Sequence, residues 1–207
     1  MLEKFLYLCP KCETIDSIHT AKNGDVTCEH CGARFRFDTD FNLVVESGGK
    51  SETKTLHQVY CSIRGKGLGN VQTSNIDVSG GETVLAVSDT AELFQETPAK
   101  MFRGYKTISA KLYTFKKIDT GLLYLTSRRL VFVGEMMTDI DLLELTSATI
   151  ESHMVITNTS RGHAYAFEFL TESGKKWEDF IREALKGVYP NKEIDEFQPR
   201  ITFMPQS

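Results

Sequence analysis

Short runs of apolar and aromatic residues, separated by polar or glycine-containing breaks, recur along most of this chain. Runs rich in Val, Ile, Phe and Tyr that alternate with polar positions are typical of strands with one buried face. Many such strands with polar breaks between them favour antiparallel sheets or a barrel. We expect strands in KFLYL, IDSIHT, DVTC, ARFRFD and FNLVV, and after residue 82 in ETVLAVS, TISAKLYTFKK, GLLYLT, RLVFVG, TDIDLLELTSATI, HMVITN and HAYAFEFL.

One segment near the C-terminal end has the spacing of an amphipathic helix. Within GKKWEDFIREALKG, apolar residues at i, i+3, i+4, i+7 and i+8 share one helical face, which can cover the open end of a sheet. These residues are Trp177, Phe180, Ile181, Ala184 and Leu185. We expect the helix to end near Gly187, with Pro190 soon after. The acidic pairs Glu178/Asp179 and Asp139/Asp141 are expected on exposed faces.

Polar and glycine-containing segments divide these patterns. SGGKSETKT, after Val45, indicates a linker or loop, and LHQVYCSIR over residues 56–64 is apolar enough for a short helix or strand. The next segment, GKGLGN, has glycines spaced as in a phosphate-binding loop. It lacks the GKS/T ending and a clear preceding strand, so we do not assign it that role.

Four of the five cysteines lie in two CxxC pairs near the N-terminus, Cys9-Pro-Lys-Cys12 and Cys28-Glu-His-Cys31. A CxxC turn directs two sulfurs at one ion, and a hairpin that brings two such turns together completes a tetrahedron. Gly32 follows the second pair, where a positive φ is often needed. We therefore predict a Zn²⁺ site at Cys9, Cys12, Cys28 and Cys31, in a stretch that resembles a zinc ribbon.

Four thiolates leave no open position for water, so the predicted Zn²⁺ is structural rather than catalytic. Two disulfides are an alternative, disfavoured because the N-terminus lacks the features of a signal peptide, and rubredoxin-like iron is a second. His19 and His30 are not expected to be ligands, and Cys61 is expected to be a small buried hydrophobic residue. A piece of roughly 40 residues buries too little surface to fold alone, so metal binding would supply much of its folding energy.

Charge is distributed unevenly along the chain. The formal net charge of −4 gives no global attraction for nucleic acid or anionic lipid. Residues 98–134 nevertheless hold eight Lys or Arg residues and a single acidic residue, Asp119, while the segments on both sides are acidic. An acidic protein with one basic stretch suggests that this stretch has a binding role.

A specific motif lies inside the basic stretch. Gly121-Leu122-Leu123-Tyr124-Leu125-Thr126 is followed by Arg129-Leu130-Val131-Phe132. This resembles the central hairpin of GRAM-type domains, a subgroup of pleckstrin-homology-like domains, and the resemblance covers about residues 82–187. It implies a PH-like antiparallel β barrel or sandwich capped by one C-terminal α-helix. It also places Ser127-Arg128 at a hairpin turn, which explains on purely structural grounds why two arginines interrupt an apolar run.

The resemblance also implies anion capture or contact with a protein partner. Phosphate-binding loops of such domains follow the first strand, which is where Lys100, Arg103 and Lys106 lie, and Arg128 and Arg129 could extend that face. Cations near a charged leaflet contribute roughly 1 kcal/mol each. The partner is therefore expected to be a protein or an anionic phospholipid head group, while the acidic flanks count against a membrane.

Other functions fit the sequence less well. No Gly-x-Ser-x-Gly, HExxH or P-loop motif is present, so we do not expect an enzyme. A ribbon followed by a GRAM-like unit is similar to accessory tails of some bacterial phospholipid acyltransferases, but the His-x₄-Asp motif of those enzymes is absent. Nucleic acid is the alternative ligand because Arg34-Phe35-Arg36-Phe37 interleaves cations and aromatics. It is disfavoured because the rest of the ribbon is acidic.

Together these patterns predict a mainly β protein in four parts. They are a zinc ribbon over 1–45, a linker over 46–81, a GRAM/PH-like domain over 82–187 and a tail over 188–207. No apolar run is long enough for a transmembrane helix. We expect a cytoplasmic binding or adaptor module, with the periphery of a membrane as a second location.

Overall fold

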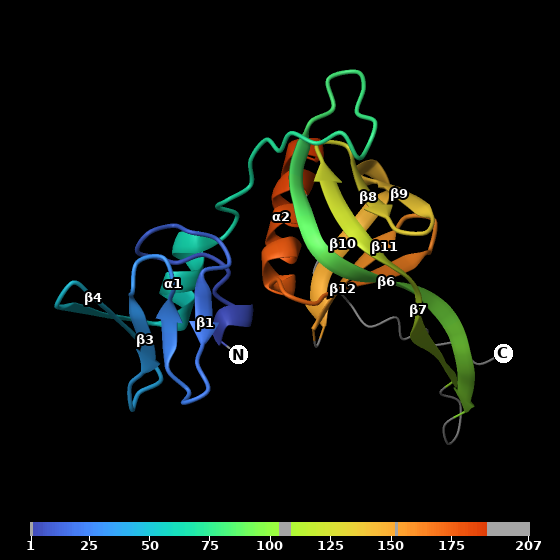
Figure 1. The fold of residues 1–207 in the computed structure, drawn as a ribbon. Coiled ribbons are helices and arrows are strands. Elements are labelled where there is room, and N and C mark those ends of the chain that lie inside the picture. The colour runs from blue at the N-terminus through green and yellow to red at the C-terminus, as the bar shows by residue number, and fades with distance from the viewer. Residues whose placement is uncertain (1, 104–108, 152, 190–207) are drawn as a thin grey trace.

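The protein is mainly β, with two antiparallel sheets, as predicted (Figure 1). The computed structural model describes residues 2–103, 109–151 and 153–189, and it describes no side chains within residues 99–113. The first part of the chain forms η1 (Leu2–Lys4), β1 (Ile18–Thr20), β2 (Val26–Cys28), β3 (Arg34–Phe37), β4 (Leu43–Ser47), β5 (Lys50–Lys54) and α1 (Leu56–Ile63). The second part forms β6 (Val84–Arg103), β7 (Ser109–Thr126), β8 (Arg129–Val133), β9 (Met137–Asp141), η2 (Leu142–Glu144), β10 (Leu145–Glu151), β11 (Met154–Thr159), β12 (Ala164–Phe169) and α2 (Gly174–Val188).

The first sheet is a five-stranded meander in the order β1-β2-β3-β4-β5. Its apolar residues lie where the alternation predicts, with Phe35 of β3 buried opposite Val45 of β4. KFLYL does not form a strand: it begins as the short helix η1, and only Leu8 makes an isolated bridge, with Ile15. The sheet continues past residue 45, since the exposed strand β5 lies within the segment expected to be a linker.

The second sheet has the order β10-β11-β12-β6-β7-β8-β9. The strands β6 to β9 pair in chain order, as do β10 to β12, and the last strand, β12, pairs with the first, β6. TISAKLYTFKK and GLLYLT, expected to be two strands, are parts of the single long strand β7. TDIDLLELTSATI is instead two strands, because Asp141 caps the short helix η2 and turns the chain between β9 and β10.

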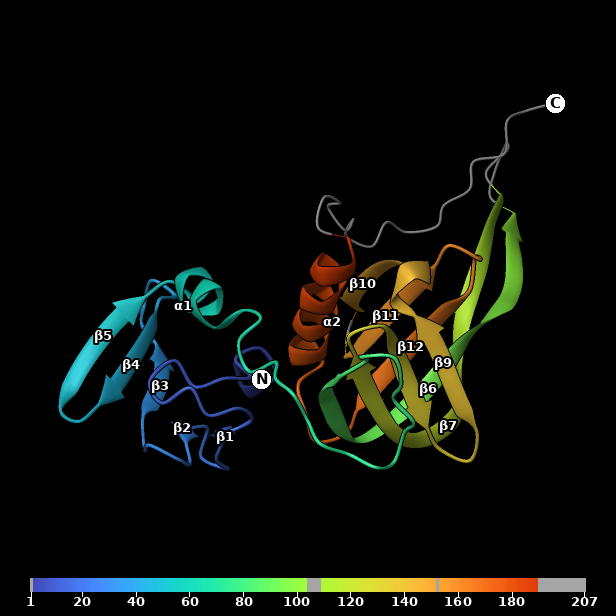
Figure 2. The ribbon, with the colours of Figure 1, turned by 90° about the horizontal axis from the view of Figure 1, so that it is seen from above.

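β6 and β7 form a hairpin whose strands extend well beyond the neighbouring strands β12 and β8. β12 pairs with β6 only between Ala91 and Gln95, and β8 pairs with β7 only between Leu122 and Leu125. The β6–β7 pairing continues to Arg103 and Ser109, so the distal part of the hairpin projects from the body of the sheet (Figure 2). We call this distal part, residues 96–103 and 109–118, the arm.

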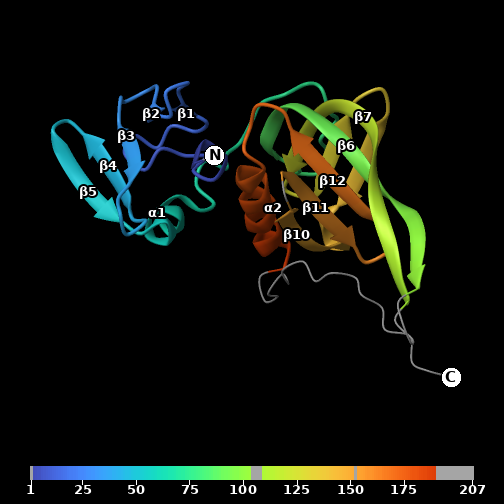
Figure 3. The same ribbon diagram turned by 90° about the horizontal axis from the view of Figure 1, so that it is seen from below.

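Each helix begins at a capping residue that the sequence supplies. Thr55 and Gln58 form a reciprocal capping box at the start of α1, which satisfies backbone amides that have no helical partner. Ser173 caps α2, and α2 runs through Gly187 to Val188. The predicted apolar stripe of α2 is buried as expected, and α2 lies between the two sheets (Figure 3).

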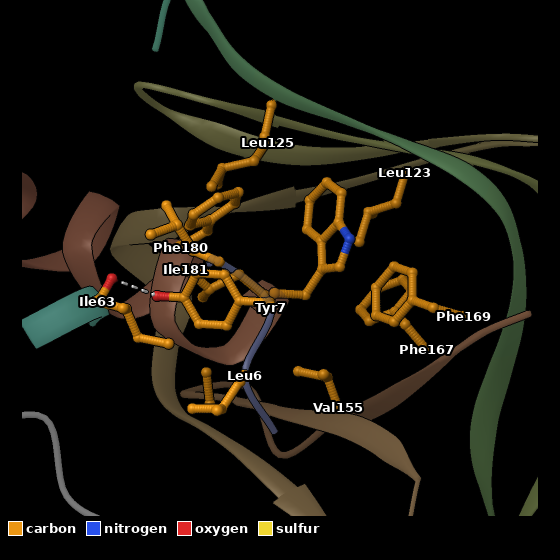
Figure 4. Close-up of a cluster of buried hydrophobic side chains, with 14 of the residues drawn as sticks. Leu6, Tyr7, Ile63, Leu123, Leu125, Val155, Phe167, Phe169, Phe180 and Ile181 are labelled. Carbon is orange, nitrogen blue, oxygen red and sulfur yellow. Dashed lines mark hydrogen bonds between the residues drawn. The ribbon is translucent and has the colours of Figure 1, made fainter. Parts of the chain in front are cut away.

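One cluster of buried side chains extends from the first sheet through α2 into the second. Figure 4 shows the part of it where Leu6, Tyr7 and Ile63 lie near α2 and the second sheet. Trp177 stacks on Phe169 with ring centroids 5.1 Å apart, and Phe180 meets the edge of Tyr7, from the N-terminal segment, at 5.9 Å. Cores of this kind contribute about 25 cal/mol per Å² of apolar surface removed from water. Because the cluster is continuous, the N-terminal part contributes to the burial of α2.

Two expectations about single residues are wrong. Glu178 and Asp179 are almost completely buried rather than exposed, because the face of α2 that carries them is covered by the N-terminal part of the chain. Cys61 is exposed rather than buried, because α1 buries Val59 and Ile63 and directs Cys61 outward next to His57. Asp139 and Asp141 are exposed, as expected.

Candidate metal centre and basic surfaces

The four predicted metal ligands come together from two turns of the first sheet. Cys9 and Cys12 lie in the turn before β1, while Cys28 ends β2 and Cys31 lies in the turn that leads to β3. Their Sγ atoms all lie within 4.8 Å of one another. No other group of three or more His, Cys, Asp or Glu residues in the described part of the chain is arranged to hold a metal ion.

The spacing of the sulfurs fits a tetrahedral metal site. The Sγ atoms of Cys9 and Cys31 are 3.7 Å apart, as are those of Cys12 and Cys28. With Zn–S bonds of about 2.3 Å, a regular tetrahedron requires about 3.8 Å between sulfurs. A disulfide requires about 2.05 Å, and all five cysteines are free. The donor set therefore fits one thiolate-bound metal ion better than two disulfides.

The two turns surround their sulfurs in the same way. Cys9 Sγ accepts hydrogen bonds from the backbone amides of Lys11 and Cys12, and Cys28 Sγ accepts the equivalent bonds from His30 and Cys31. Amides directed at sulfur stabilise the thiolate, which is the form that binds metal. The CxxC spacing therefore provides two pairs of ligands and also backbone donors that favour their ionisation.

Burial and mutual repulsion oppose full ionisation of the four thiols. Burial raises the pKa of the Cys9 and Cys31 thiols, whereas Cys12 has its pKa lowered to about 5 because hydrogen bonds from Thr14 outweigh burial. Four negative sulfurs at these distances repel one another, and a divalent cation removes that repulsion. The residues present thus fit a structural metal bound by four thiolates.

The residue after each CxxC pair adopts a left-handed backbone conformation. Gly32 has φ = 70°, as its sequence position suggests, and Glu13 occupies the equivalent place with φ = 56°. The amide of Gly32 donates to Cys28 O at 2.9 Å, and that of Glu13 donates to Cys9 O at 2.8 Å. The turns are therefore equivalent although only one of them contains glycine.

Arg128 and Arg129 lie at the turn between β7 and β8, where the motif predicts a turn at Ser127-Arg128. Arg129 Nε donates to Glu82 Oε1 at 2.9 Å, and Nη1 donates to Asp139 Oδ1 at 3.1 Å. Arg128 Nη2 donates to the carbonyl oxygen of Gly80 at 2.6 Å. Both guanidinium groups thus hold the loop before β6, and the charge of Arg129 is already paired.

These arginines border a hollow of mixed charge. Besides Arg128 and Arg129 it contains Arg161, which pairs with Glu144, and the carboxylates of Glu82 and Asp139. Burial opposes ionisation of Glu82, but its hydrogen bond with Arg129 lowers the pKa of that carboxyl. The hollow is therefore balanced internally and does not concentrate positive charge.

The other tentative anion ligands lie outside the described side chains. Lys100 and Arg103 have their backbone in β6, and Lys106 lies outside the described residues. Lys116 and Lys117, at the base of the arm, are exposed, and Lys117 pairs with Glu92 at 2.6 Å. The strands β6 and β7 thus carry five of the eight cations of the basic stretch, and Lys106 lies between them in the sequence.

Sequence reasoning missed a set of polar residues between the N-terminal part and α2. Tyr60 donates to Asp179 Oδ1 at 2.6 Å, and Lys176 pairs with Asp16 and, at 3.1 Å, with Glu172. Within α2, Lys176 and Asp179 are spaced like residues on an ordinary solvent-exposed helical face. The sequence does contain the capping residues Thr55 and Gln58, which indicate where α1 begins. They do not indicate which surface α1 packs against.

Comparisons with known proteins leave the family open. No protein-family model matches this chain, and no curated protein matches it. Among solved structures, the C-terminal domain of an unknown protein from Leishmania infantum is 16% identical, with 54% of this chain and 87% of that one covered and a TM-score of 0.27. A TM-score this low is not evidence of a shared fold. In the described part of the chain, no helix has the length and apolar character needed to cross a bilayer.

Proposed function

We propose that this chain is a non-catalytic binding or adaptor module in which a structural Zn²⁺ supports a small ribbon and a GRAM/PH-like β domain contacts an acidic protein partner through the arm. The meander that returns to its own first strand, with one helix across the open end, is compatible with the PH-like resemblance. The sulfur spacing of the ribbon is compatible with zinc.

The observation that carries the proposal is the coincidence of the basic stretch with the arm. Cations are concentrated on the β6–β7 hairpin, while the segments before residue 98 and after residue 134 are acidic. Beyond residue 95 in β6 and before residue 122 in β7, the hairpin has no further strand paired to its edges within the described part of the chain. It therefore offers backbone groups and positive charge to a partner.

A protein partner fits better than a charged membrane. Electrostatic attraction acts over about 8 Å at physiological ionic strength, so the arm attracts an acidic surface that contacts it directly. A bilayer is broad and would also approach the acidic body, which it would repel. A protein partner can present a local acidic patch, and this arrangement gives both attraction and discrimination.

The test is a pulldown from native cells with a triple variant of the arm, Lys100→Gln with Arg103→Gln and Lys111→Gln, beside the wild-type chain. The matched control, Lys22→Gln with Lys50→Gln and Lys186→Gln, removes the same charge elsewhere. We expect the arm variant to lose a partner that the control retains, and raised salt to weaken the wild-type interaction. Equal capture by both variants would contradict a role for the arm.

Liposome flotation separates the protein partner from lipid. With vesicles of neutral lipid and vesicles containing phosphatidylserine and a phosphoinositide, we expect no flotation of the wild-type chain. Flotation that requires anionic lipid and is lost in the arm variant would replace the protein partner with an anionic head group.

Nucleic acid remains the second candidate because of one feature of β3. Phe37, the last residue of β3, and Phe41, between β3 and β4, are exposed by 46% and 83%. Exposed aromatic rings beside cations are the elements of a single-strand stacking surface. Arg36, however, pairs with Glu46 at 3.1 Å. A salt-dependent gel shift with single-stranded RNA that is lost on Phe37→Ala would favour this candidate.

A further inference from the structure

The N-terminal segment just before the first metal ligand is buried against α2. Leu6 and Tyr7 are each only 1% exposed, and the ring of Tyr7 meets Phe180 (Figure 4). The Tyr7 hydroxyl donates to Ile63 O at 3.1 Å and accepts from the amide of Gly65 at 2.9 Å. This segment, residues 2–8, therefore joins α1 and α2, and it is directly continuous with Cys9.

The turn that carries the first CxxC pair also contacts α2. Asp16 pairs with Lys176, whose side chain is only 6% exposed. Lys176 also pairs with Glu172, and Glu172 accepts from the indole nitrogen of Trp177 at 2.5 Å. A nearly buried lysine needs its counter-ions, since an unpaired buried charge is costly. Asp16, just before β1, thus begins a network that continues through Lys176 and Glu172 to the indole of Trp177.

Backbone hydrogen bonds connect these contacts to the metal ligands. The amide of Cys9 donates to Thr14 O at 3.0 Å, and the amide of Asp16 donates to Tyr7 O at 2.7 Å. On the other side, Ser17 Oγ lies 3.3 Å from Cys28 Sγ. The positions of Tyr7 and Asp16 are therefore fixed by the same turn that positions the sulfurs.

We propose that metal occupancy of the Cys9, Cys12, Cys28 and Cys31 site controls whether the N-terminal part stays docked on α2. With the metal bound, the turn holds Tyr7 and Asp16 against α2. Without it, the four thiols relax, the turn opens, and residues 2–20 leave the helix. The surface uncovered carries Lys176 and Phe180, so loss of the metal exposes a face of α2 that is buried when the metal is bound.

The opening is limited to the N-terminal part because only the first sheet depends on the metal for its folding. The first sheet is small and depends on the metal for folding, as small metal-bound units do. The second sheet has its own buried residues, such as Leu123, Phe132 and Phe167, and its seven strands are paired to one another. It therefore persists when the first sheet opens. This inference rests on the proposed structural metal, and it does not rest on the proposed partner.

Lysine labelling in the whole chain tests the proposal. The rate of reductive methylation of Lys176 is followed by mass spectrometry in the metal-loaded protein and after chelation under reducing conditions, with exposed Lys22 as an internal reference. Amide exchange of residues 122–132 reports on the second sheet. We expect chelation to raise Lys176 labelling at least several-fold while residues 122–132 stay protected.

Asp16→Asn provides a variant that tests the same contact with metal present. Asn tolerates the positive φ of 50° at this position, so the turn is preserved. We expect faster Lys176 labelling with unchanged metal content, whereas the control Asp40→Asn, at an exposed position, leaves labelling unchanged.

Two results would overturn the proposal. Unchanged Lys176 labelling after complete metal removal would mean that docking does not depend on the metal. Loss of protection in residues 122–132 together with Lys176 would mean that the whole chain unfolds as one unit, so that no local opening exists.

Discussion

At the scale of single residues, the metal-binding turns depend on a backbone conformation that most side chains disfavour. Gly32 and Glu13 both have positive φ in equivalent places, and nothing lies within 4 Å of a Cβ added at Gly32. A substitution at Gly32 is therefore disfavoured by conformation alone, without a steric clash with neighbouring residues. The positive φ of Glu13 is likewise a strained backbone conformation. Its side chain makes an exposed ion pair with Lys66, which offsets little of this strain.

Gly32→Ala is expected to destabilise the folded protein by about 1–2 kcal/mol, because a left-handed conformation is costly for a residue with a Cβ. Glu13→Gly is expected not to destabilise it. Thermal unfolding of the metal-loaded protein measures both. Gly69→Ala is the control, because Gly69 has an ordinary φ and open space around it. Equal effects at Gly32 and Gly69 would contradict the conformational explanation.

The ion pair of Glu82 and Arg129 predicts a dependence of stability on pH. The pKa of Glu82 is lowered in the folded state, so the pair stabilises the protein above the ordinary glutamate value of 4.5. This contribution is lost as the pH falls through the lowered, folded-state pKa. Urea unfolding between pH 6 and pH 3 should show a smaller decline for Glu82→Gln than for the wild-type chain, and parallel declines would contradict the assignment.

At the scale of elements, the β7–β8 hairpin requires a close backbone approach. A Cβ at Gly121 would lie 2.1 Å from Val133 O, which is a backbone atom fixed by the strand pairing. A Cβ at Gly134 would lie 2.4 Å from a carboxylate oxygen of Asp119, which is a side chain on the exposed rim. The GLLYLT motif therefore begins with glycine because any larger residue would clash with β8, which the motif alone does not reveal.

We expect Gly121→Ala to destabilise the protein by about 1–3 kcal/mol, because overpacking against a paired strand forces backbone shifts. Gly134→Ala is expected to cost less, since only the Asp119 side chain must move, at the expense of its hydrogen bonds from the amides of Glu135 and Met136. Chemical denaturation of both variants measures the difference. A larger loss for Gly134→Ala than for Gly121→Ala would show that the β7–β8 register is not the constraint.

At the scale of the whole molecule, α2 joins the two sheets. One face of α2 packs with Trp177 and Ile181 in the core, and Glu178 and Asp179 are covered as well. Within the described part of the chain, Asp179 Oδ2 is buried without a hydrogen-bond partner. Such a group is costly, and Tyr60 and Lys175 offset this cost only at the other oxygen.

A fragment beginning at residue 68 is therefore expected to be less stable than the β domain in the intact chain, because it exposes Phe180, removes Asp16 from Lys176 and removes Tyr60 from Asp179. Thermal unfolding followed by Trp177 fluorescence measures this, and binding of a hydrophobic dye should increase. Leu6→Ala in the full chain is the milder counterpart, expected to cost about 2–5 kcal/mol. A fragment as stable as the intact chain would show that the N-terminal part adds nothing to the β domain.

Local pattern predicted much of this fold because the relevant physics is local. The alternation of Phe35 with its neighbours, the stripe of α2 and the spacing of the cysteines each depend on a few adjacent residues. The wrong predictions concern contacts between residues that are distant in the sequence. Asp179 looks solvated from its neighbours, but it is buried and bonded to Tyr60, more than a hundred residues away in the sequence. The same is true of β5, whose polar residues form a strand only because β4 pairs with them.

The sequence by itself determined the two CxxC pairs, the strands β1 to β4, the turn at Ser127-Arg128 and the concentration of cations before residue 134, since each depends on residue type and spacing. Only the tertiary structure decided that Arg129 is already paired with Glu82 and Asp139, and that Asp16 and Tyr7 connect the cysteine cluster to α2. The physical reason is that pairing and burial are properties of surfaces brought together by folding, and residues distant in the chain supply the other half of each contact.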